Sequence, residues 1–308
     1  MKAILKIAEV SRQAAHKYFK QQAEFQNKLS DLILEADILR EEHPGCGVEK
    51  MYETLQPDWL GRDKFISLFM NLGYRVKIQK NYQRTTVPVH SQYENLIQGM
   101  LVQDKNIVWQ TDITYYQIGA QYFYIVFIID VYTKMILGYQ ASDHLRAEAN
   151  LTALKMAIRN SSGSLVNLIH HSDRGSQYIS TPYIGLLNKM GIRISMGAKA
   201  QDNAYAERIN GTIKNEYLKY WEPQNLKELK SMVKRAVTHY NNKRTHGNLP
   251  GKVTPVKFEK SLVDLTSQKR PTVIIYAEGN YKIKVASSHL DFKPKREPLA
   301  HNCPIEIK

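Results

Sequence analysis

The feature that most restricts the fold is a run of three strand-like segments followed by alternating helical and strand-like segments. Residues 107–116 and 122–132 are rich in β-branched and aromatic side chains, and residues 118–121 supply a turn between them. Residues 135–142 have the pattern of a third strand. Three consecutive strands joined by short turns predict an antiparallel meander.

Helices and strands alternate after the meander. The predicted elements are a helix over 146–160, a strand over 167–171, a helix over 182–190, a strand over 192–196, and helices over 203–220 and 225–242. This order predicts an α/β protein whose mixed sheet carries helices on both faces, and it is the element order of a ribonuclease-H-like core. We place this core at residues 101–262.

Residues 1–80 show helical patterns only. The segments 4–8 and 12–21 predict two helices, and Ser11 suits the N-cap of the second. A helix, a short turn and a capped second helix match a helix-turn-helix. The second helix then presents four side chains suited to DNA contact, which are Arg12, Gln13, His16 and Lys17. The alternative is an ordinary helical hairpin with a solvated polar face.

A second helical unit of the same kind follows. Its predicted helices cover residues 30–42, 48–55 and 62–72, and a basic linker over 81–100 leads into the core. Three cations near the start of this linker are suited to lie along phosphates, namely Lys77, Lys80 and Arg84. The alternative for this stretch is a solvated tether. Residues 263–308 predict a small basic β-rich module or tail, with a hairpin of strands 272–276 and 281–285.

The charge of the chain favours a polyanionic partner. Lys and Arg number 43 against 29 Asp and Glu, which gives a net charge of +14, although a basic surface kept for solubility is the alternative. The two cysteines exclude a disulfide scaffold and a classical zinc finger. The longest apolar stretch, residues 122–129, is far shorter than the roughly 20 residues of a membrane helix. We therefore expect a cytoplasmic protein without a membrane partner.

Three acidic residues stand where carboxylates can converge. Asp112 lies inside the first strand, where β-propensity disfavours Asp, Asp173 ends the fourth strand, and Glu207 lies in the first turns of the helix over 203–220. Convergent carboxylates repel one another unless a cation lies between them, and oxygen ligands suit Mg²⁺ or Mn²⁺. Two such ions about 3.5–4 Å apart can support phosphoryl transfer. Taken singly, Asp173 can cap a turn and Glu207 can be a solvated residue.

Residues near these acids have predicted supporting roles. Lys214 lies two turns after Glu207 on one helix face and is suited to hold a phosphate, unless it is only a surface lysine; Arg208 and Asn210 can assist. Three further polar residues have predicted structural roles: Asp202 and Asn203 cap the helix rather than bind metal, and Asp130, late in its strand, is structural rather than a metal ligand. Adjacent strand residues point to opposite faces, so His171, rather than His170, is expected beside the acids.

The sequence resembles bacterial insertion-sequence transposases. The segments HSDRGSQY (171–178) and DNAYAERINGTIK (202–214) are similar to motifs of the IS-three family, in its second-frame product, within the retroviral-integrase superfamily; residues 109–115, 129–134, 240–249 and 254–255 fit the same family. The likeness covers about residues 100–260 with specific motifs and residues 1–80 loosely. It implies an Asp-Asp-Glu site at Asp112, Asp173 and Glu207. It also implies that a helical product of an upstream reading frame is fused to, or assembles with, this chain.

These observations predict a DNA transposase. Water activated by two Mg²⁺ or Mn²⁺ ions would cut one strand at the element's end, and the exposed 3′-hydroxyl would attack a target phosphodiester. The helical units would bind the inverted-repeat ends, and bringing two ends together requires a multimer. We expect the protein at the bacterial nucleoid. The alternatives are a ribonuclease-H-like nuclease or resolvase without strand transfer, and a non-catalytic helix-turn-helix regulator.

Overall fold

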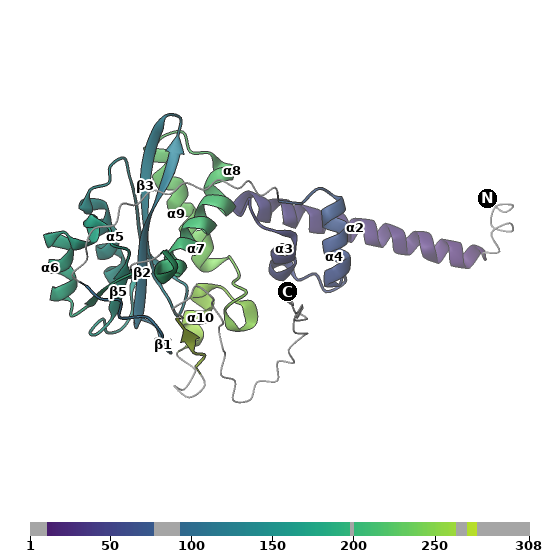
Figure 1. Cartoon of the computed structure of the whole chain (residues 1–308). Helices are drawn as coiled ribbons and strands as arrows, with labels where there is room; N and C mark the ends of the chain where they lie inside the picture. Colours follow the sequence, from purple (N-terminus) through teal and green to yellow (C-terminus); the bar gives the residue numbers. More distant parts are fainter. Residues whose placement is uncertain (1–10, 77–92, 198–199, 263–269, 276–308) are drawn as a thin grey trace, which may run out of the picture.

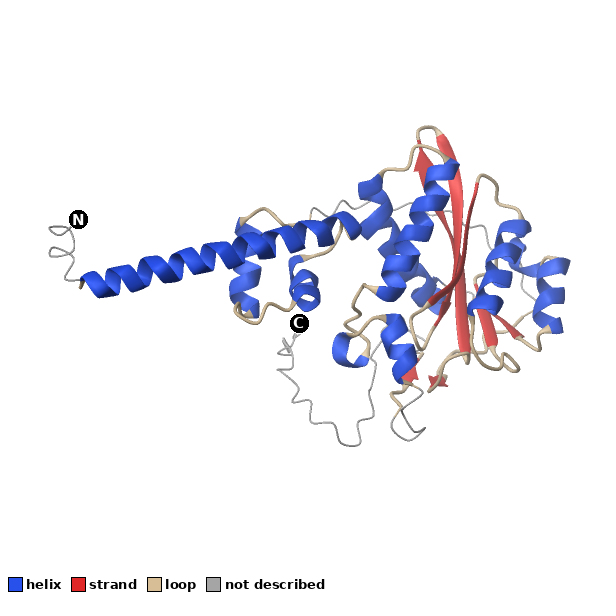
Figure 2. Ribbon diagram, turned by 180° about the vertical axis from the view of Figure 1, so that it is seen from behind, coloured by secondary structure: helices blue, strands red, loops and turns tan. Residues whose placement is uncertain are grey.

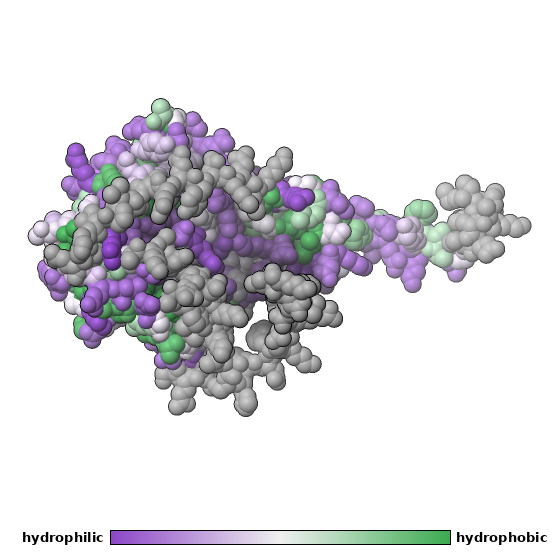
Figure 3. Space-filling view, viewed as in Figure 1, coloured by the Kyte–Doolittle hydropathy of each residue, from purple (hydrophilic) through white to green (hydrophobic). Residues whose placement is uncertain are grey.

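A computed structural model describes residues 11–76, 93–197, 200–262 and 270–275. It shows a body built around a sheet, a small helical region beside it, and one long helix whose first half extends away from both (Figures 1 and 2). Much of the face in view in Figure 3 is hydrophilic, with hydrophobic side chains in small groups. No helix among the described residues is long and apolar enough to cross a membrane.

The sheet has five strands in the order β4-β3-β2-β5-β6. The three strands β2 (Val108–Ile118), β3 (Gln121–Asp130) and β4 (Ile136–Ser142) form the predicted antiparallel meander. The strands β5 (Ile169–Ser172) and β6 (Arg193–Met196) extend the sheet in parallel with β2. The sheet is therefore mixed, as the sequence predicted for a ribonuclease-H-like core.

Helices cover both faces of the sheet because the central strand is apolar on both sides. In β3, Val126 and Ile128 pack in a cluster with α5 (Ala147–Asn160) and α6 (Thr181–Lys189). The alternating residue Phe127 faces the other way, as successive strand side chains must. Predicted helix positions and observed ones differ here only at their ends.

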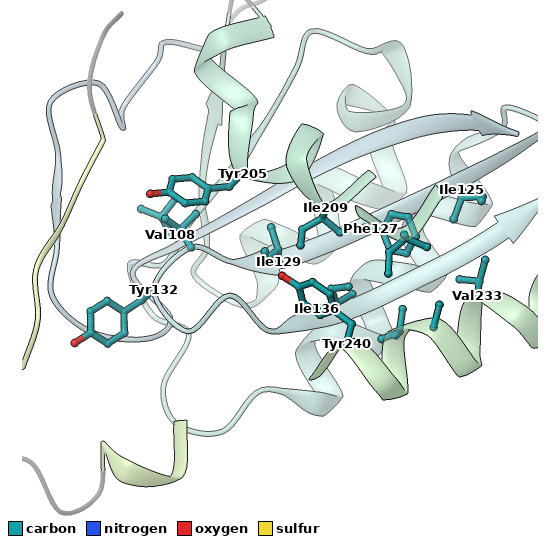
Figure 4. Packing of buried hydrophobic residues seen from close by; sticks show 14 of the residues in the cluster. Val108, Ile125, Phe127, Ile129, Tyr132, Ile136, Tyr205, Ile209, Val233 and Tyr240 are labelled. Atoms are coloured by element: carbon teal, nitrogen blue, oxygen red, sulfur yellow. The ribbon is translucent and has the colours of Figure 1, made fainter. Parts of the chain in front are cut away.

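The second face carries three further helices. These are α7 (Ala204–Ile213), α9 (Leu226–Asn242) and α10 (Pro255–Ser261). Figure 4 shows Ile209 and Tyr240 from two of these helices beside Phe127 and Ile129 of the sheet. This face positions α7, which carries Glu207, against β2, which carries Asp112.

The helix predicted over 203–220 is interrupted. After α7 the chain continues through a π-helical turn, Lys214–Leu218, and then α8 (Lys219–Trp221). Short 3₁₀ turns cover η1 (Ser176–Ile179), η2 (Ala200–Asn203) and η4 (Pro250–Lys252). The π turn adds a residue to the helical repeat and so changes which face the following side chains occupy.

The two helices predicted over 12–21 and 30–42 are wrong as separate elements. They form one helix, α2 (Arg12–Glu42), which begins at the predicted cap, where the Ser11 hydroxyl accepts a hydrogen bond from the Ala14 N–H (3.1 Å). The segment between them contains no Gly or Pro to end a helix. Ser30 does not cap a new helix, because its hydroxyl donates to the Gln26 carbonyl one turn back (3.0 Å).

The second half of α2 packs against α3 (Val48–Leu55) and α4 (Arg62–Asn71), close to the predicted boundaries. Buried Leu32 and Ala36 meet Phe65 and Phe69 there. The helix predicted over 4–8 lies outside the described residues, so the pairing of a first helix-turn-helix stays a prediction.

Two short strands from opposite ends of the core pair with each other. The strand β7 (Val273–Ile274) lies within the predicted strand 272–276 and pairs with β1 (Leu101–Val102) in an antiparallel manner. The second strand of the predicted hairpin, over 281–285, lies outside the described residues.

Gly138 allows α5 to approach β4 closely. A Cβ at this position would lie 2.1 Å from the Ala153 carbonyl oxygen, which is a backbone atom and cannot turn aside. We expect Gly138→Ala to lower the free energy of unfolding by about 1–3 kcal/mol through overpacking. Denaturant unfolding measures this loss. Gly185→Ala in α6, where nothing lies within 4 Å of the added Cβ, is the control, and equal effects of the two changes would contradict the expectation.

Candidate active site

The sheet brings Asp112 and Asp173 to the same region. Strands β2 and β5 are parallel neighbours, with Gln110 of β2 opposite His171 of β5. Asp112 follows Gln110 by two residues, and Asp173 follows His171 by two. The two carboxylates are thus at matching positions on adjacent strands, as the sequence predicted.

The electrostatics of Asp112 bring Glu207 into the same group. Burial, with the charge of Asp173 and a smaller contribution from the charge of Glu207, raises the pKa of Asp112 to about 8. Burial also raises the pKa of Asp173, while a hydrogen bond from the Gly175 N–H (3.1 Å) lowers it. Glu207 itself is exposed on α7. Repulsion between these carboxylates is the dominant charge interaction at Asp112.

This donor set fits a hard divalent cation. Three carboxylates supply only oxygen ligands, and positive charge between them would relieve the repulsion that Asp112 experiences. Within the described ranges, however, no three acidic, histidine or cysteine side chains are already grouped closely enough to form a metal cage. The chemistry of the residues therefore suits Mg²⁺ or Mn²⁺, while a finished coordination shell is not present.

Asn210 of α7 and Lys214, the first residue of the π turn, lie on the helix face that meets β2. The Asn210 Nδ2 donates to Asp112 Oδ2 (2.8 Å). The Lys214 Nζ donates to Thr114 Oγ1 (3.0 Å) and to the Tyr115 carbonyl (3.3 Å). Burial lowers the pKa of Lys214, whereas the charge of Asp112 raises it. Lys214 is thus half-buried beside the carboxylates rather than a free surface lysine.

The other predicted contact residues belong to α7, to α2 and to the linker. Arg208 is exposed on α7. Gln13, His16 and Lys17 are exposed on the projecting half of α2, and Arg12 is its first residue. The linker residues Lys77, Lys80 and Arg84 lie outside the described residues.

Asp130 has the predicted structural role. It is buried, and its carboxylate accepts hydrogen bonds from the backbone N–H groups of Asn106 (2.8 Å), Tyr132 (3.1 Å) and Thr133 (2.7 Å). These bonds fix the turn that joins β3 to β4.

The two histidines of β5 face opposite ways, as predicted. His170 Nε2 pairs with the hydroxyl of Tyr183 (3.0 Å), on the α6 side. His171 Nδ1 pairs with Ser195 Oγ (2.8 Å), and its ring lies near Asp202. Burial lowers the pKa of His171 to about 4, although the charge of Asp202 opposes this shift. His171 therefore lies on the side of the sheet that faces α7.

The expected capping of α7 is confirmed for the position of Asn203 but not for its side chain. Asn203 occupies the N-cap position, but its side chain makes no capping bond and instead donates to the Thr111 carbonyl (2.6 Å). The carbonyl of Asp202 accepts from Gln110 Nε2 (3.2 Å). Gln110, a buried residue of β2 that the sequence did not single out, also accepts from the first turn of α7. A polar side chain in an otherwise apolar strand was the available signal.

A second polar cluster joins the helical region to the core. Glu216, in the π turn, accepts two hydrogen bonds from Arg244 (2.7 Å each) and pairs with His43 (2.5 Å) and Lys50 (3.4 Å). Its carbonyl accepts from the Gly45 N–H (2.8 Å). His43 stacks on Tyr217 at 4.8 Å between ring centres. We call these side chains the Glu216 cluster, and sequence reasoning missed it because its members are far apart in the chain.

Comparison with known proteins places the chain in a family. Models described as "Integrase core domain" match residues 103–201 and 188–255. The insertion element IS600 uncharacterized 31 kDa protein of Shigella sonnei is 34% identical over 207 residues, which are 65% of this chain and 75% of that protein. The putative transposase for insertion sequence element IS986/IS6110 of Mycobacterium tuberculosis is 32% identical, over 69% of this chain and 81% of that protein.

A solved structure of the HTLV-2 integrase catalytic core domain in complex with magnesium has a TM-score of 0.41 and 20% identity, covering 54% of this chain and 99% of that chain. The sequence relatives and the integrase core models define the class: the chain is an insertion-element transposase with an integrase core. Within that class it belongs to the IS-three family of the retroviral-integrase superfamily.

Asp112 is held at a cost in stability. Its pKa is raised from 3.8 to about 8, so the folded protein loses stability as pH rises from about 3.8 to about 8, the range in which only the folded state keeps this proton. We expect Asp112→Asn to raise the free energy of unfolding in EDTA by about 1–4 kcal/mol at pH 8.5, and by much less near pH 4. Urea unfolding at the two pH values measures this. The control is Asp143→Asn, an exposed change, and a loss of stability in Asp112→Asn at pH 8.5 would contradict the expectation.

Proposed function

We propose that this transposase cuts and joins DNA through an Asp-Asp-Glu triad of Asp112, Asp173 and Glu207. The observation that carries the proposal is the placement of three acids in a chain of this family: Asp112 lies on β2, Asp173 directly follows β5, and Glu207 lies on α7, which packs on β2. Two Mg²⁺ or Mn²⁺ ions held by these residues would supply the positive charge that phosphoryl transfer needs. In this proposal Asp112, Asp173 and Glu207 would together hold the ions.

The chain's own residues orient the reaction. Asn210 fixes one oxygen of Asp112 by donating to it at 2.8 Å, and so orients the carboxylate. Lys214, two turns after Glu207, is placed to bind a non-reacting phosphate beside the carboxylates. Arg208 adds positive charge on the exposed side of α7. Together these residues bind the DNA backbone, while the carboxylates face the phosphodiester that reacts.

The helical region, residues 1–80, is proposed to recognise the inverted-repeat ends. Its exposed Gln13, His16 and Lys17, with Arg12, would contact DNA from α2, and the linker cations Lys77, Lys80 and Arg84 would follow the backbone. Target DNA then enters the same active site as a second substrate. The proposal includes a multimer that brings two ends together, assembly with an upstream-frame helical partner, and action at the nucleoid.

The decisive experiment uses DNA that carries the native element's ends together with a target plasmid. We expect Mg²⁺- or Mn²⁺-dependent nicking at the element's end, followed by joined product. Nicking under all conditions without joined product would favour the ribonuclease-H-like nuclease, and DNA binding without any cutting, even with the upstream-frame product added, would favour the regulator. Either result would overturn the proposal.

A further inference from the structure

The catalytic helix begins without a cap of its own. The first backbone N–H groups of a helix have no partner within the helix and need one from elsewhere. In α7 this partner comes from the sheet: Gln110 Oε1 accepts from the N–H groups of Tyr205 (3.0 Å) and Ala206 (3.4 Å). These residues immediately precede Glu207.

The side-chain amide of Gln110 is held through its nitrogen as well as its oxygen. Its Nε2 donates to the carbonyl of Asp202 (3.2 Å), in the turn that leads into α7. Gln110 is only 1% exposed, and a buried amide is tolerated only where its polar atoms are bonded. The side chain therefore has one orientation, and that orientation ties the entrance of α7 to β2.

Gln110 is the first member of a series of polar contacts between β2 and α7. Residues 110, 112 and 114 point to one face of the strand, because strand side chains alternate. Along that face, Asp112 meets Asn210 and Thr114 meets Lys214. The Gln110 contact is the one nearest to Glu207 in the helix, because it holds the two residues before it.

We propose that Gln110 is a positioning residue that sets the place of Glu207 relative to Asp112. The inference rests on the triad proposed above. A glutamine two residues before Asp112 on the same strand face holds the N–H groups just before Glu207, so one side chain links the two carboxylates' positions. Without it, the first turn of α7 would fray and Glu207 would lose its fixed distance from Asp112.

The variant Gln110→Met tests this role, because Met fills similar volume and accepts no strong hydrogen bond. We expect amide hydrogen exchange at Tyr205 and Ala206 to become at least about tenfold faster, with exchange in β3 unchanged. We expect Mn²⁺ binding, followed by the paramagnetic resonance of the free ion, to weaken about 10–100-fold, and strand cutting to fall by a similar factor at fixed Mn²⁺. DNA affinity should stay as in the wild type.

Two further variants separate positioning from a general loss of structure. Gln117→Met changes a glutamine of the same strand that is exposed and bonds only within its own turn, so exchange and Mn²⁺ binding should not change. Gln110→Glu keeps oxygens that accept from Tyr205 and Ala206 at the positive end of the helix, so their slow exchange should persist. Fast exchange at these amides in Gln110→Glu would overturn the capping role.

The result for Gln110 is distinguishable from the result for the triad. If Asp112→Asn cuts DNA as the wild type does, the proposed function fails. In the other case the triad variants are inactive, but Gln110→Met shows wild-type amide hydrogen exchange at Tyr205 and Ala206 and wild-type Mn²⁺ binding. Only the proposed role of Gln110 is then wrong.

Discussion

Glu207→Gln and Asp112→Asn each remove DNA cutting and joining, with an expected loss on the order of 10³-fold or more. Either change keeps the size of the side chain but replaces a carboxylate by a neutral amide, which binds a divalent cation far less well. Members of one catalytic group act as a unit, so the double variant should lose little more than either single one. The measurement is the rate of nicked and joined product with Mg²⁺ and, separately, with Mn²⁺.

The matched control is Glu148→Gln. Glu148 is, like Glu207, an exposed acid in the first turn of a helix, but it lies on α5. This variant should cut and join at the wild-type rate, and all variants should bind end DNA with unchanged affinity. Full activity of Glu207→Gln would remove Glu207 from the catalytic group.

Glu216→Gln has the largest expected effect on stability. Glu216 is the only acid among the cluster's side chains within the described residues, and its loss leaves Arg244, Lys50 and His43 together without a negative charge. Arg244 is 10% exposed and Glu216 is 21% exposed. Removing one partner of such a pair costs about 3–5 kcal/mol, and denaturant unfolding measures this as a lower midpoint. The control Glu42→Gln breaks an exposed pair with Lys243 and should cost less than about 1 kcal/mol.

The effect of Glu216→Gln should depend on pH. Burial raises the pKa of Glu216, but hydrogen bonds from Arg244 and His43 lower it more, to well below its usual range. A depressed pKa in the folded protein stabilises it above the unfolded pKa of about 4.5, and that contribution is lost as pH falls through the folded value. The difference in unfolding free energy between wild type and variant is therefore constant near pH 7 and shrinks below about pH 4.5. A difference that grows in acid would rule out this account.

The sheet and its helices could be predicted because their signals are local. The alternation of Val126, Phe127 and Ile128 marks a strand buried on both faces, and short turns mark the meander. The three candidate acids were also readable, because an Asp inside a strand is unfavourable and therefore conspicuous at Asp112. Their roles remain a proposal, although their positions on β2, β5 and α7 agree with the prediction.

The remaining features depend on contacts between distant residues. The predicted break within α2 placed the start of a helix at Ser30, but a serine inside a helix can bond to the preceding turn. The true cap of α7 comes from Gln110, 95 residues before Tyr205. The Glu216 cluster combines residues from four separate segments. No local pattern specifies these partners, since folding alone brings them together.

The π turn at Lys214–Leu218 sets the direction in which side chains after α7 point, relative to the side chains of α7 itself. A regular α-helix turns by about 100° per residue, so one extra residue in a turn rotates everything beyond it by that angle. Before the turn, Asn210 faces Asp112; within it, Glu216 faces His43 and Arg244. The extra residue thus lets one helical segment contact both β2 and the helical region, which lie in different directions from it. After deletion of one residue in this turn, the helix could no longer direct Asn210 toward Asp112 and Glu216 toward His43 at the same time, even though all of these side chains were kept.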